Sequence, residues 1–287
     1  MSRTSLLADH KVEAIFHPSD FSEASEIAFG HALKIALMTG ARLTMLHVTA
    51  TDDLAWQDFP AVRDTLARWQ LLPKDSPKSA VGQLGIDVRK IIATGDDPAK
   101  ACLRYLDKHP ADLVVLAVHP HAGRMRWLAK AVGEPLARRA GQMTLFIPHG
   151  VEGFVSRQDG SVRLRRILVP ITGTPRPQPA LEAAARLIRG LQLPAGEVTL
   201  LHAGPPGGMP AVKLPAGTGW SWHRVARDGE PAQVILRTAS ERAADLIIMT
   251  TDGPDGFLDV LRGTTSERVL REARCPVADL PAGSMLG

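Results

Sequence analysis

The chain of 287 residues is long enough for two domains of ordinary size, and 45% of its residues are apolar and 22% charged. This balance excludes a disordered chain. The net charge of +4 divides into +2 on residues 1–150 and +2 on residues 151–287, which excludes a strongly basic nucleic-acid-binding domain. Only two cysteines are present, which excludes a disulfide framework or a thiolate zinc site.

The amino-terminal segment carries Asp9, His10, Lys11 and Glu13 before any long apolar run begins. It is therefore typical of neither a signal peptide nor a membrane anchor. No run along the chain approaches 18 apolar residues, so we expect no membrane span. We expect a cytoplasmic protein.

The first half opens with a β–turn–helix–β pattern over Val12–Val48, which closes with the pair Leu46-His47. Trp56–Leu72 predicts a further helix. The run LVVLAV at Leu113–Val118 lacks the alternation of a half-exposed strand, which is typical of a parallel strand buried on both faces.

The second half repeats this order. Leu164–Ala203 shows the same β run, Pro-containing turn, helical pattern and final strand, which again ends in Leu201-His202. Two later motifs also recur: Gly95–Ala99 matches Asp228–Ala232, and Ala111–Leu116 matches Ala244–Met249. Strands that alternate with helices in two successive copies predict an α/β protein with two doubly wound parallel sheets.

Two segments interrupt the repeat. His149–Val162 is rich in Gly and polar residues and is interpreted as the linker between domains at 1–150 and 163–287. Gly204–Gly219 is dense in Pro and Gly, which prevents a regular helix. The second domain is therefore predicted to have lost one helix and to carry a loop in its place.

A candidate anion site follows the late apolar strand of the second half. Gly253 and Gly263 enclose nine residues, and Gly263 leads directly into a helical pattern that opens with the capping box Thr264–Glu267. A helix N-terminus offers free N–H groups and a positive dipole end. At the carboxyl end of a parallel strand, this is where α/β proteins usually bind ligands.

Three segments, IFHPSDFSEAS, ILVPITGT and GTTSERVLREARCPV, resemble a tandem universal stress protein over residues 12–148 and 164–280. The resemblance implies two flavodoxin-like (Rossmann-like) domains, each a parallel five-stranded sheet flanked by helices. Such domains pair through their last strands, here Gln142–Pro148 and Cys275–Leu280. It therefore implies intramolecular pairing and a monomer or a homodimer.

Family members that bind ATP carry Gly-x-x-Gly, nine residues, and then Gly-Ser or Gly-Thr. In the second domain Thr250 stands at the first glycine, and Thr172 stands where the family has an Asp after the first strand. The resemblance implies ATP or another adenine nucleotide, with Mg²⁺ only as its companion, at Pro170, Thr172, Met249, Thr250, Gly253, Gly263, Thr264 and Thr265.

The first domain keeps the Asp, as Asp20, but places Glu134 and Pro135 at the phosphate position. Two unit charges 4 Å apart interact by about 4 kcal/mol at an effective dielectric constant of 20. A helix terminus returns only about 0.3–1 kcal/mol to an anion. We therefore predict that no ATP binds in the first domain.

Other candidates have plainer interpretations. His47 and His202 recur at one strand end and are interpreted as structural, and His119-Pro-His121 as a solvated loop rather than a metal site. No P-loop, G-x-S-x-G elbow or placed general base is present, so we expect no enzyme, with slow ATP hydrolysis as the third alternative.

The leading hypothesis is a cytoplasmic stress-response protein that binds an adenine nucleotide in its second domain as a sensor. The alternative is a module that binds no nucleotide and recruits a protein partner or a hydrophobic ligand. It would do so through Gly204–Gly219 or the basic face Arg124–Arg139. No nucleic acid or membrane partner is expected.

Overall fold

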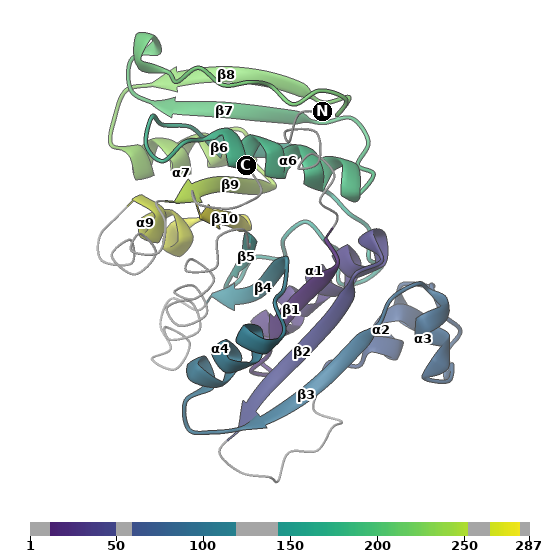
Figure 1. The fold of residues 1–287 in the computed structure, drawn as a ribbon. Coiled ribbons are helices and arrows are strands. Elements are labelled where there is room, and N and C mark those ends of the chain that lie inside the picture. The colour runs from purple at the N-terminus through teal and green to yellow at the C-terminus, as the bar shows by residue number, and fades with distance from the viewer. Residues whose placement is uncertain (1–11, 50–58, 119–142, 252–264, 282–287) are drawn as a thin grey trace, which may run out of the picture.

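The computed structural model describes residues 12–49, 59–118, 143–251 and 265–281 (Figure 1). The first half contains β1 (Ala14–Pro18), α1 (Glu23–Thr39), β2 (Arg42–Thr49), α2 (Val62–Arg68), α3 (Ser79–Gln83), β3 (Val88–Thr94), α4 (Pro98–Lys108), β4 (Leu113–Val118) and β5 (Met143–Pro148). The second half contains β6 (Arg166–Pro170), α6 (Gln178–Gly190), β7 (Glu197–Ala203), the 3₁₀ turn η3 (Pro206–Gly208), β8 (Ser221–Arg227), α7 (Pro231–Glu241), β9 (Leu246–Thr251), α9 (Thr265–Glu272) and β10 (Val277–Pro281).

All ten strands form one sheet in the order β3-β2-β1-β4-β5-β10-β9-β6-β7-β8. Each half uses the same internal order, and every neighbouring pair is parallel except β5 and β10, which are antiparallel. The predicted α/β fold of two Rossmann-like halves is therefore confirmed, and the halves join through their last strands. The domain limits 1–150 and 163–287 stay predictions.

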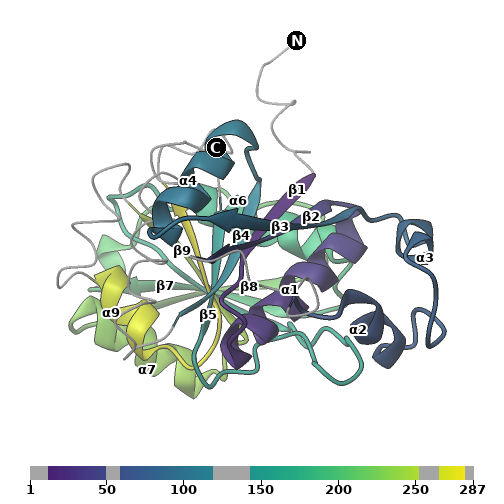
Figure 2. The same cartoon turned by 90° about the horizontal axis from the view of Figure 1, so that it is seen from below.

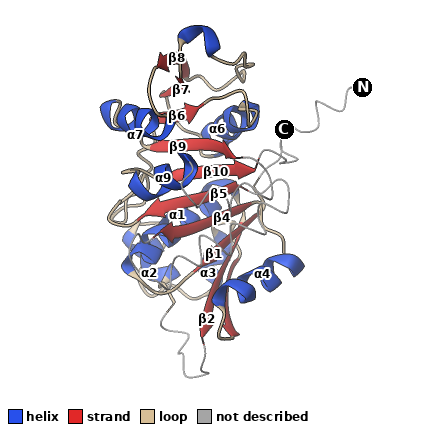
Figure 3. Cartoon of the chain, turned by 90° about the vertical axis from the view of Figure 1, so that its left-hand side faces the viewer, coloured by secondary structure: helices blue, strands red, loops and turns tan. Residues whose placement is uncertain are grey.

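Helices cover both faces of the sheet (Figures 2 and 3). One core cluster lies under α1 and α6, and the other lies under α4, α7 and α9. Within β4, Val114 packs into the second cluster and Val115 into the first, and both are fully buried. Burial on both faces explains why LVVLAV shows no polar alternation.

The recurring Asp/Glu-Pro motif starts equivalent helices. Asp97 accepts a hydrogen bond from the Lys100 amide (3.1 Å), and Glu230 accepts from the Ala232 and Gln233 amides (3.0 Å each). Pro98 and Pro231 occupy first helical positions, where a missing N–H costs nothing. The carboxylate cap and the proline together explain why this motif appears in both halves.

The predicted loss of a helix in the second half is confirmed. Between β2 and β3 the chain forms α2, which lies inside the predicted Trp56–Leu72, and the unpredicted α3; between β7 and β8 it forms only η3. The Gln178 side-chain amide exchanges two hydrogen bonds with the Lys213 backbone (3.0 and 3.1 Å). Met209 and Val212 pack against the core, so this loop takes the helix's place as a cover.

The segment interpreted as a linker is a hairpin docked on α1. Val155 and Val162 form an antiparallel bridge. The imidazole of His31, on α1, accepts the backbone N–H groups of Phe154 (3.0 Å) and Val155 (3.2 Å) at Nε2 and donates from Nδ1 to the Ile27 carbonyl (2.9 Å). This hairpin buries the outer side of α1, which explains why α1 is apolar nearly all round.

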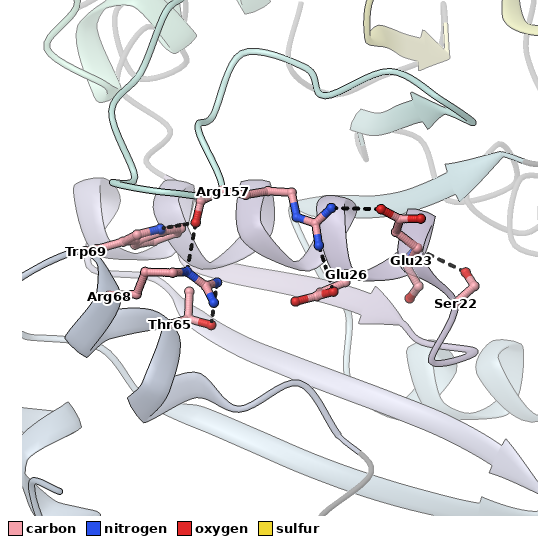
Figure 4. A network of polar contacts seen from close by, with 8 residues as sticks. Ser22, Glu23, Glu26, Thr65, Arg68, Trp69 and Arg157 are labelled. Atoms are coloured by element: carbon pink, nitrogen blue, oxygen red, sulfur yellow. Dashed lines mark hydrogen bonds and ion pairs between the residues drawn. The ribbon is translucent and has the colours of Figure 1, made fainter. Parts of the chain in front are cut away.

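Arg157 fixes the tip of this hairpin (Figure 4). Its guanidinium contacts Glu23 (3.1 Å) and Glu26 (3.0 Å) on α1. Its carbonyl accepts hydrogen bonds from Arg68 Nε (2.9 Å) and Trp69 Nε1 (3.2 Å). One residue of the linker thus joins α1 to the end of α2.

Candidate functional site

The candidate site lies at the carboxyl ends of β6 and β9, which are neighbours in the sheet. Pro170 ends β6, Thr172 follows it as an exposed residue, and Met249 and Thr250 lie near the end of β9. Thr265 is the first residue of α9. The fold therefore brings these five positions to one edge. Gly253, Gly263 and Thr264 lie outside the described residues.

Met249 and Thr250 point to opposite faces of the sheet, as successive strand residues do. Met249 is 6% exposed and packs into the core under α7 and α9, so only its backbone can face a ligand. The Thr250 hydroxyl is buried and has no hydrogen-bond partner in the described part of the chain. An unpaired buried hydroxyl costs free energy, and a ligand at this edge could satisfy it.

The recurring Leu-His pair holds the turn after the first strand of each half. His47 Nδ1 lies 2.7 Å from the Ser19 carbonyl, and His202 Nδ1 lies 3.2 Å from the Ile171 carbonyl. Because a carbonyl can only accept, each histidine donates and is fixed as one tautomer. The structural interpretation of both histidines is confirmed.

The two halves differ beside these histidines. In the first half, the Phe21 ring stacks on His47 with centroids 4.0 Å apart, and Phe59 meets Phe21 edge-on at 5.2 Å. Strand register makes Gly173 the counterpart of Phe21, and a Cβ atom there would meet nothing within 4 Å. Phe21 has a positive φ of 62° and Gly173 does not, so a side chain at position 173 would leave the backbone in another direction, into open space.

The first domain's Asp20 is engaged within its own turn. One carboxylate oxygen accepts hydrogen bonds from the Ser22 amide (3.1 Å) and hydroxyl (2.7 Å). Glu134 and Pro135, on which the prediction of an empty first domain rests, lie outside the described residues, as do His119, His121 and Arg124–Arg139. That prediction therefore stays a prediction.

Sequence reasoning missed a buried carboxyl group on β10. Asp279 accepts a hydrogen bond from the Thr251 hydroxyl (3.2 Å) at one oxygen, while its other oxygen has no partner among the described residues. Burial raises the pKa of Asp279 to about 7. The signal was an acidic residue in the apolar run VADLP, where strand register places Phe146 in the first half.

Within the described ranges, no group of three or more His, Cys, Asp or Glu side chains is placed to hold a metal ion. No helix in those ranges is long and apolar enough to cross a bilayer. Both cysteines are buried, and burial raises the pKa of each thiol to about 12, which fits the predicted structural role of Cys275.

The family model for the universal stress protein family matches residues 12–148 and 214–278. The chain belongs to this family. A universal stress protein of Methanocaldococcus jannaschii is 42% identical over 55 residues, 19% of this chain and 32% of its own length. The chain spans about a third of the length of the curated relatives that it matches.

Solved structures extend the likeness to the whole chain. A universal stress protein from Archaeoglobus fulgidus is 19% identical, covers 93% of this chain and 96% of its own, and has a TM-score of 0.62. At this identity the likeness shows a shared fold, here of two stress-protein domains in tandem. A universal stress protein in complex with cAMP matches 48% of this chain and 98% of its own, at 19% identity and a TM-score of 0.35.

Proposed function

We propose that this universal stress protein is a cytoplasmic stress-response protein whose second domain binds ATP or another adenine nucleotide as a sensor. The observation that carries the proposal is the shared edge of β6 and β9, followed in sequence by Gly253 and Gly263 and then by α9. Ligands of parallel α/β sheets bind at this edge, and the amino end of a helix favours phosphate.

Two local features support the second domain over the first. Gly173 has open space around it, whereas its counterpart Phe21 carries a ring that stacks on His47. The unpaired Thr250 hydroxyl supplies a polar group at the same edge. One universal stress protein is known in complex with cAMP, so binding of an adenine nucleotide occurs within the family.

Acidic residues in the sequence favour a metal-bound nucleotide. Asp252, Asp255 and Asp259 bring negative charge to the segment between β9 and α9. Mg²⁺ neutralises phosphate oxygens and commonly joins a protein through one or two carboxylates. We therefore propose Mg²⁺ as a companion of the nucleotide and not as an independent ligand.

We propose binding without turnover. Thr172 stands where other family members have an Asp, and no described side chain at this edge is placed as a general base. A conformational or partner-recognition output would then follow nucleotide occupancy. Steady phosphate release that is lost in a Gly263→Glu variant would instead establish an ATPase.

The alternative function, recruitment of a partner or a hydrophobic ligand, is less well supported. Met209 and Val212 of the remodelled loop pack against the core, and Leu214 at 42% is one of two exposed large apolar residues in the described ranges. The loop covers the core and offers no broad apolar face. This alternative function would be favoured if no nucleotide binds.

Native mass spectrometry with Mg-ATP tests the proposal. Gly173→Phe introduces the residue type of Phe21 and should abolish the adduct, because it places a bulky ring in the open space at this edge of the sheet. Gly82→Phe adds the same ring to an exposed glycine on α3 that also has open space around it, and should keep the adduct. An absent wild-type adduct, or one that survives both Gly173→Phe and Gly263→Glu, would overturn the proposal.

A further inference from the structure

A basic pocket of about 240 Å³ lies at the opposite end of the first-half strands, between their amino ends and the end of α4. Its polar lining consists of Arg42, Thr44, Arg89, Tyr105, Lys108 and His109. This volume lies just below the range of about 300–1,000 Å³ that is typical of small-molecule sites. The pocket therefore suits a small ligand.

Strand alternation gathers the cations on one face. Arg42 and Thr44 are two residues apart on β2, and Thr44 is paired with Arg89 on β3, so all three side chains share the face that α4 covers. Lys108 ends α4 and His109 follows it. The register of the sheet and the length of α4 thus bring these cationic side chains together at one end of the strands.

Tyr105 forms the aromatic wall of this pocket. Its ring stacks on Phe16 with centroids 5.6 Å apart and meets His109 at 4.6 Å. These contacts hold the half-buried ring at the pocket, where its hydroxyl can donate a hydrogen bond.

The pocket keeps a net positive charge. Among the described residues neither Arg42 nor Lys108 forms an ion pair, while Arg89 contacts Asp87 at 2.9 Å. Asp112, at the pocket's border, directs one carboxylate oxygen to the Glu13 and Ala14 amides. The carboxyl end of α4 adds about half a negative charge. Three cations therefore face two carboxylates and this partial charge, so the local excess is positive but small.

The second half provides an internal comparison at the same place. Strand register makes Glu197 the counterpart of Arg42 and His223 the counterpart of Arg89, and the repeat makes Glu241 the counterpart of Lys108. Two cations have become carboxylates. Glu241 is paired with Arg227 and Arg237. The border carboxylate is common to both halves, as Asp112 and Asp245. The second half carries Arg166 and Arg242 where the first has Ala14 and His109, but Arg166 contacts Asp245 (3.4 Å). The first half is therefore distinguished by Arg42 and Lys108, which form no ion pair among the described residues.

We propose that this pocket binds a small phosphomonoester, with the phosphate held by Arg42, Arg89 and Lys108. Guanidinium groups match phosphate oxygens in a two-point geometry, and Lys adds a point charge. A phosphomonoester carries about −1.5 to −2 charges at pH 7. The site is independent of the nucleotide site proposed for the second domain.

The chain contains a single tyrosine, so fluorotyrosine labelling gives one ¹⁹F signal, from Tyr105 in this pocket. The labelled full chain is titrated with glycerol 3-phosphate, inorganic phosphate or succinate, at constant ionic strength maintained with chloride. We expect a saturable shift of the signal that is tightest for glycerol 3-phosphate. Nucleotide binding in the second domain is followed separately by mass spectrometry, so either proposal can fail alone.

Matched variants test the three cations. Arg42→Glu with Lys108→Glu copies the second half's residues and should weaken the binding of glycerol 3-phosphate at least 10-fold. The neutral pair Arg42→Gln with Lys108→Gln should weaken this binding less. Lys74→Glu with Lys78→Glu makes the same change in net charge at exposed positions outside the pocket lining and should leave affinity within twofold.

Three results would overturn the proposal. The first is no saturable shift with any probe. The second is equal weakening in the Lys74/Lys78 control, which would show a diffuse charge effect. The third is equal affinity for succinate, which would show an unselective anion patch. Separately, tighter binding of inorganic phosphate than of glycerol 3-phosphate would identify the free ion, and not the ester, as the ligand.

Discussion

Two of the places where the halves meet each contain a buried titratable side chain. At the linker hairpin, His31 is completely buried, and burial lowers its pKa to about 4, so it is neutral and all its ring nitrogens are paired. At the β5–β10 junction, Asp279 is also buried, with a pKa raised to about 7 and one oxygen without a partner among the described residues.

The difference lies in how completely each group is satisfied. A neutral imidazole that receives two backbone N–H groups stabilises the hairpin near neutral pH. A buried carboxyl group whose second oxygen has no partner in the described ranges resists ionisation and costs stability when it does ionise. The buried His31 therefore stabilises the fold at neutral pH, whereas ionisation of the buried Asp279 near neutral pH destabilises it.

The largest expected effect is at the β5–β10 junction. The folded chain holds a proton on Asp279 up to about pH 7, whereas the unfolded carboxyl releases it near 3.8, so the stability that this proton contributes is lost as pH rises between these values. Asp279→Asn should therefore raise the free energy of unfolding at pH 7 by about 4 kcal/mol. Urea denaturation should show this gain shrinking towards pH 4; a gain that is independent of pH would contradict it.

At the hairpin the sign is reversed. The folded chain excludes a proton from His31 down to about pH 4, and the unfolded chain takes it up near 6.5, so stability falls as pH falls through this window, by about 3 kcal/mol. His17, also completely buried with a pKa of about 4, acts in the same direction. In His31→Gln, the decrease in the free energy of unfolding as pH falls through this window, measured by urea denaturation, should be smaller by the contribution of this one titrating group. An unchanged slope would mean that His31 does not titrate in this window.

A third prediction tests the fit of the hairpin on α1. A Cβ atom at Gly153, where φ is +79°, would lie 2.3 Å from His31 Nε2, whereas one at Gly217, where φ is +72°, would meet nothing within 4 Å. Both alanine variants bear the strain of positive φ, so only the clash differs. Gly153→Ala should lose about 2 kcal/mol more than Gly217→Ala in thermal or urea unfolding. Equal losses would mean that the hairpin can move away.

The smallest effect is expected for the ion pairs at the hairpin tip. Glu23 and Glu26 are 78% and 46% exposed in their side chains, so their contacts with Arg157 are screened by water and salt. Arg157→Ala keeps the carbonyl that binds Arg68 and Trp69, and should cost at most about 1 kcal/mol. The loss should decrease further in high salt; a larger, salt-independent loss would show that the guanidinium packs the hairpin.

Much of the fold could be predicted, because the repeat ties distant segments to one another. The two Leu-His pairs, the Pro-started helices and the continuous apolar runs each recur, and together they predict two parallel sheets. The missing helix could be predicted because Pro and Gly act locally. The role of His31 could not, because its partners lie 123 and 124 residues away and are backbone groups without a sequence signal.

The candidate site was predicted less completely. Spacing alone located the edge formed by β6 and β9, but no spacing rule shows that Met249 is turned into the core or that Gly173 faces open space. Asp279 could have been noticed as a charge in an apolar run. Its burial became evident only when the two halves were seen to share one sheet, because that junction covers it.

The single antiparallel pair reverses the direction of half the strands, so each long border of the sheet carries the amino ends of one half and the carboxyl ends of the other. The basic pocket and the proposed nucleotide edge thus lie along the same border. The opposite border carries the aromatic stack on His47 and the carboxylates Glu197 and Glu241. Because the two halves differ at opposite ends of their strands, the two borders of the sheet are chemically different. The two-fold symmetry of a dimer of identical subunits would make these borders the same.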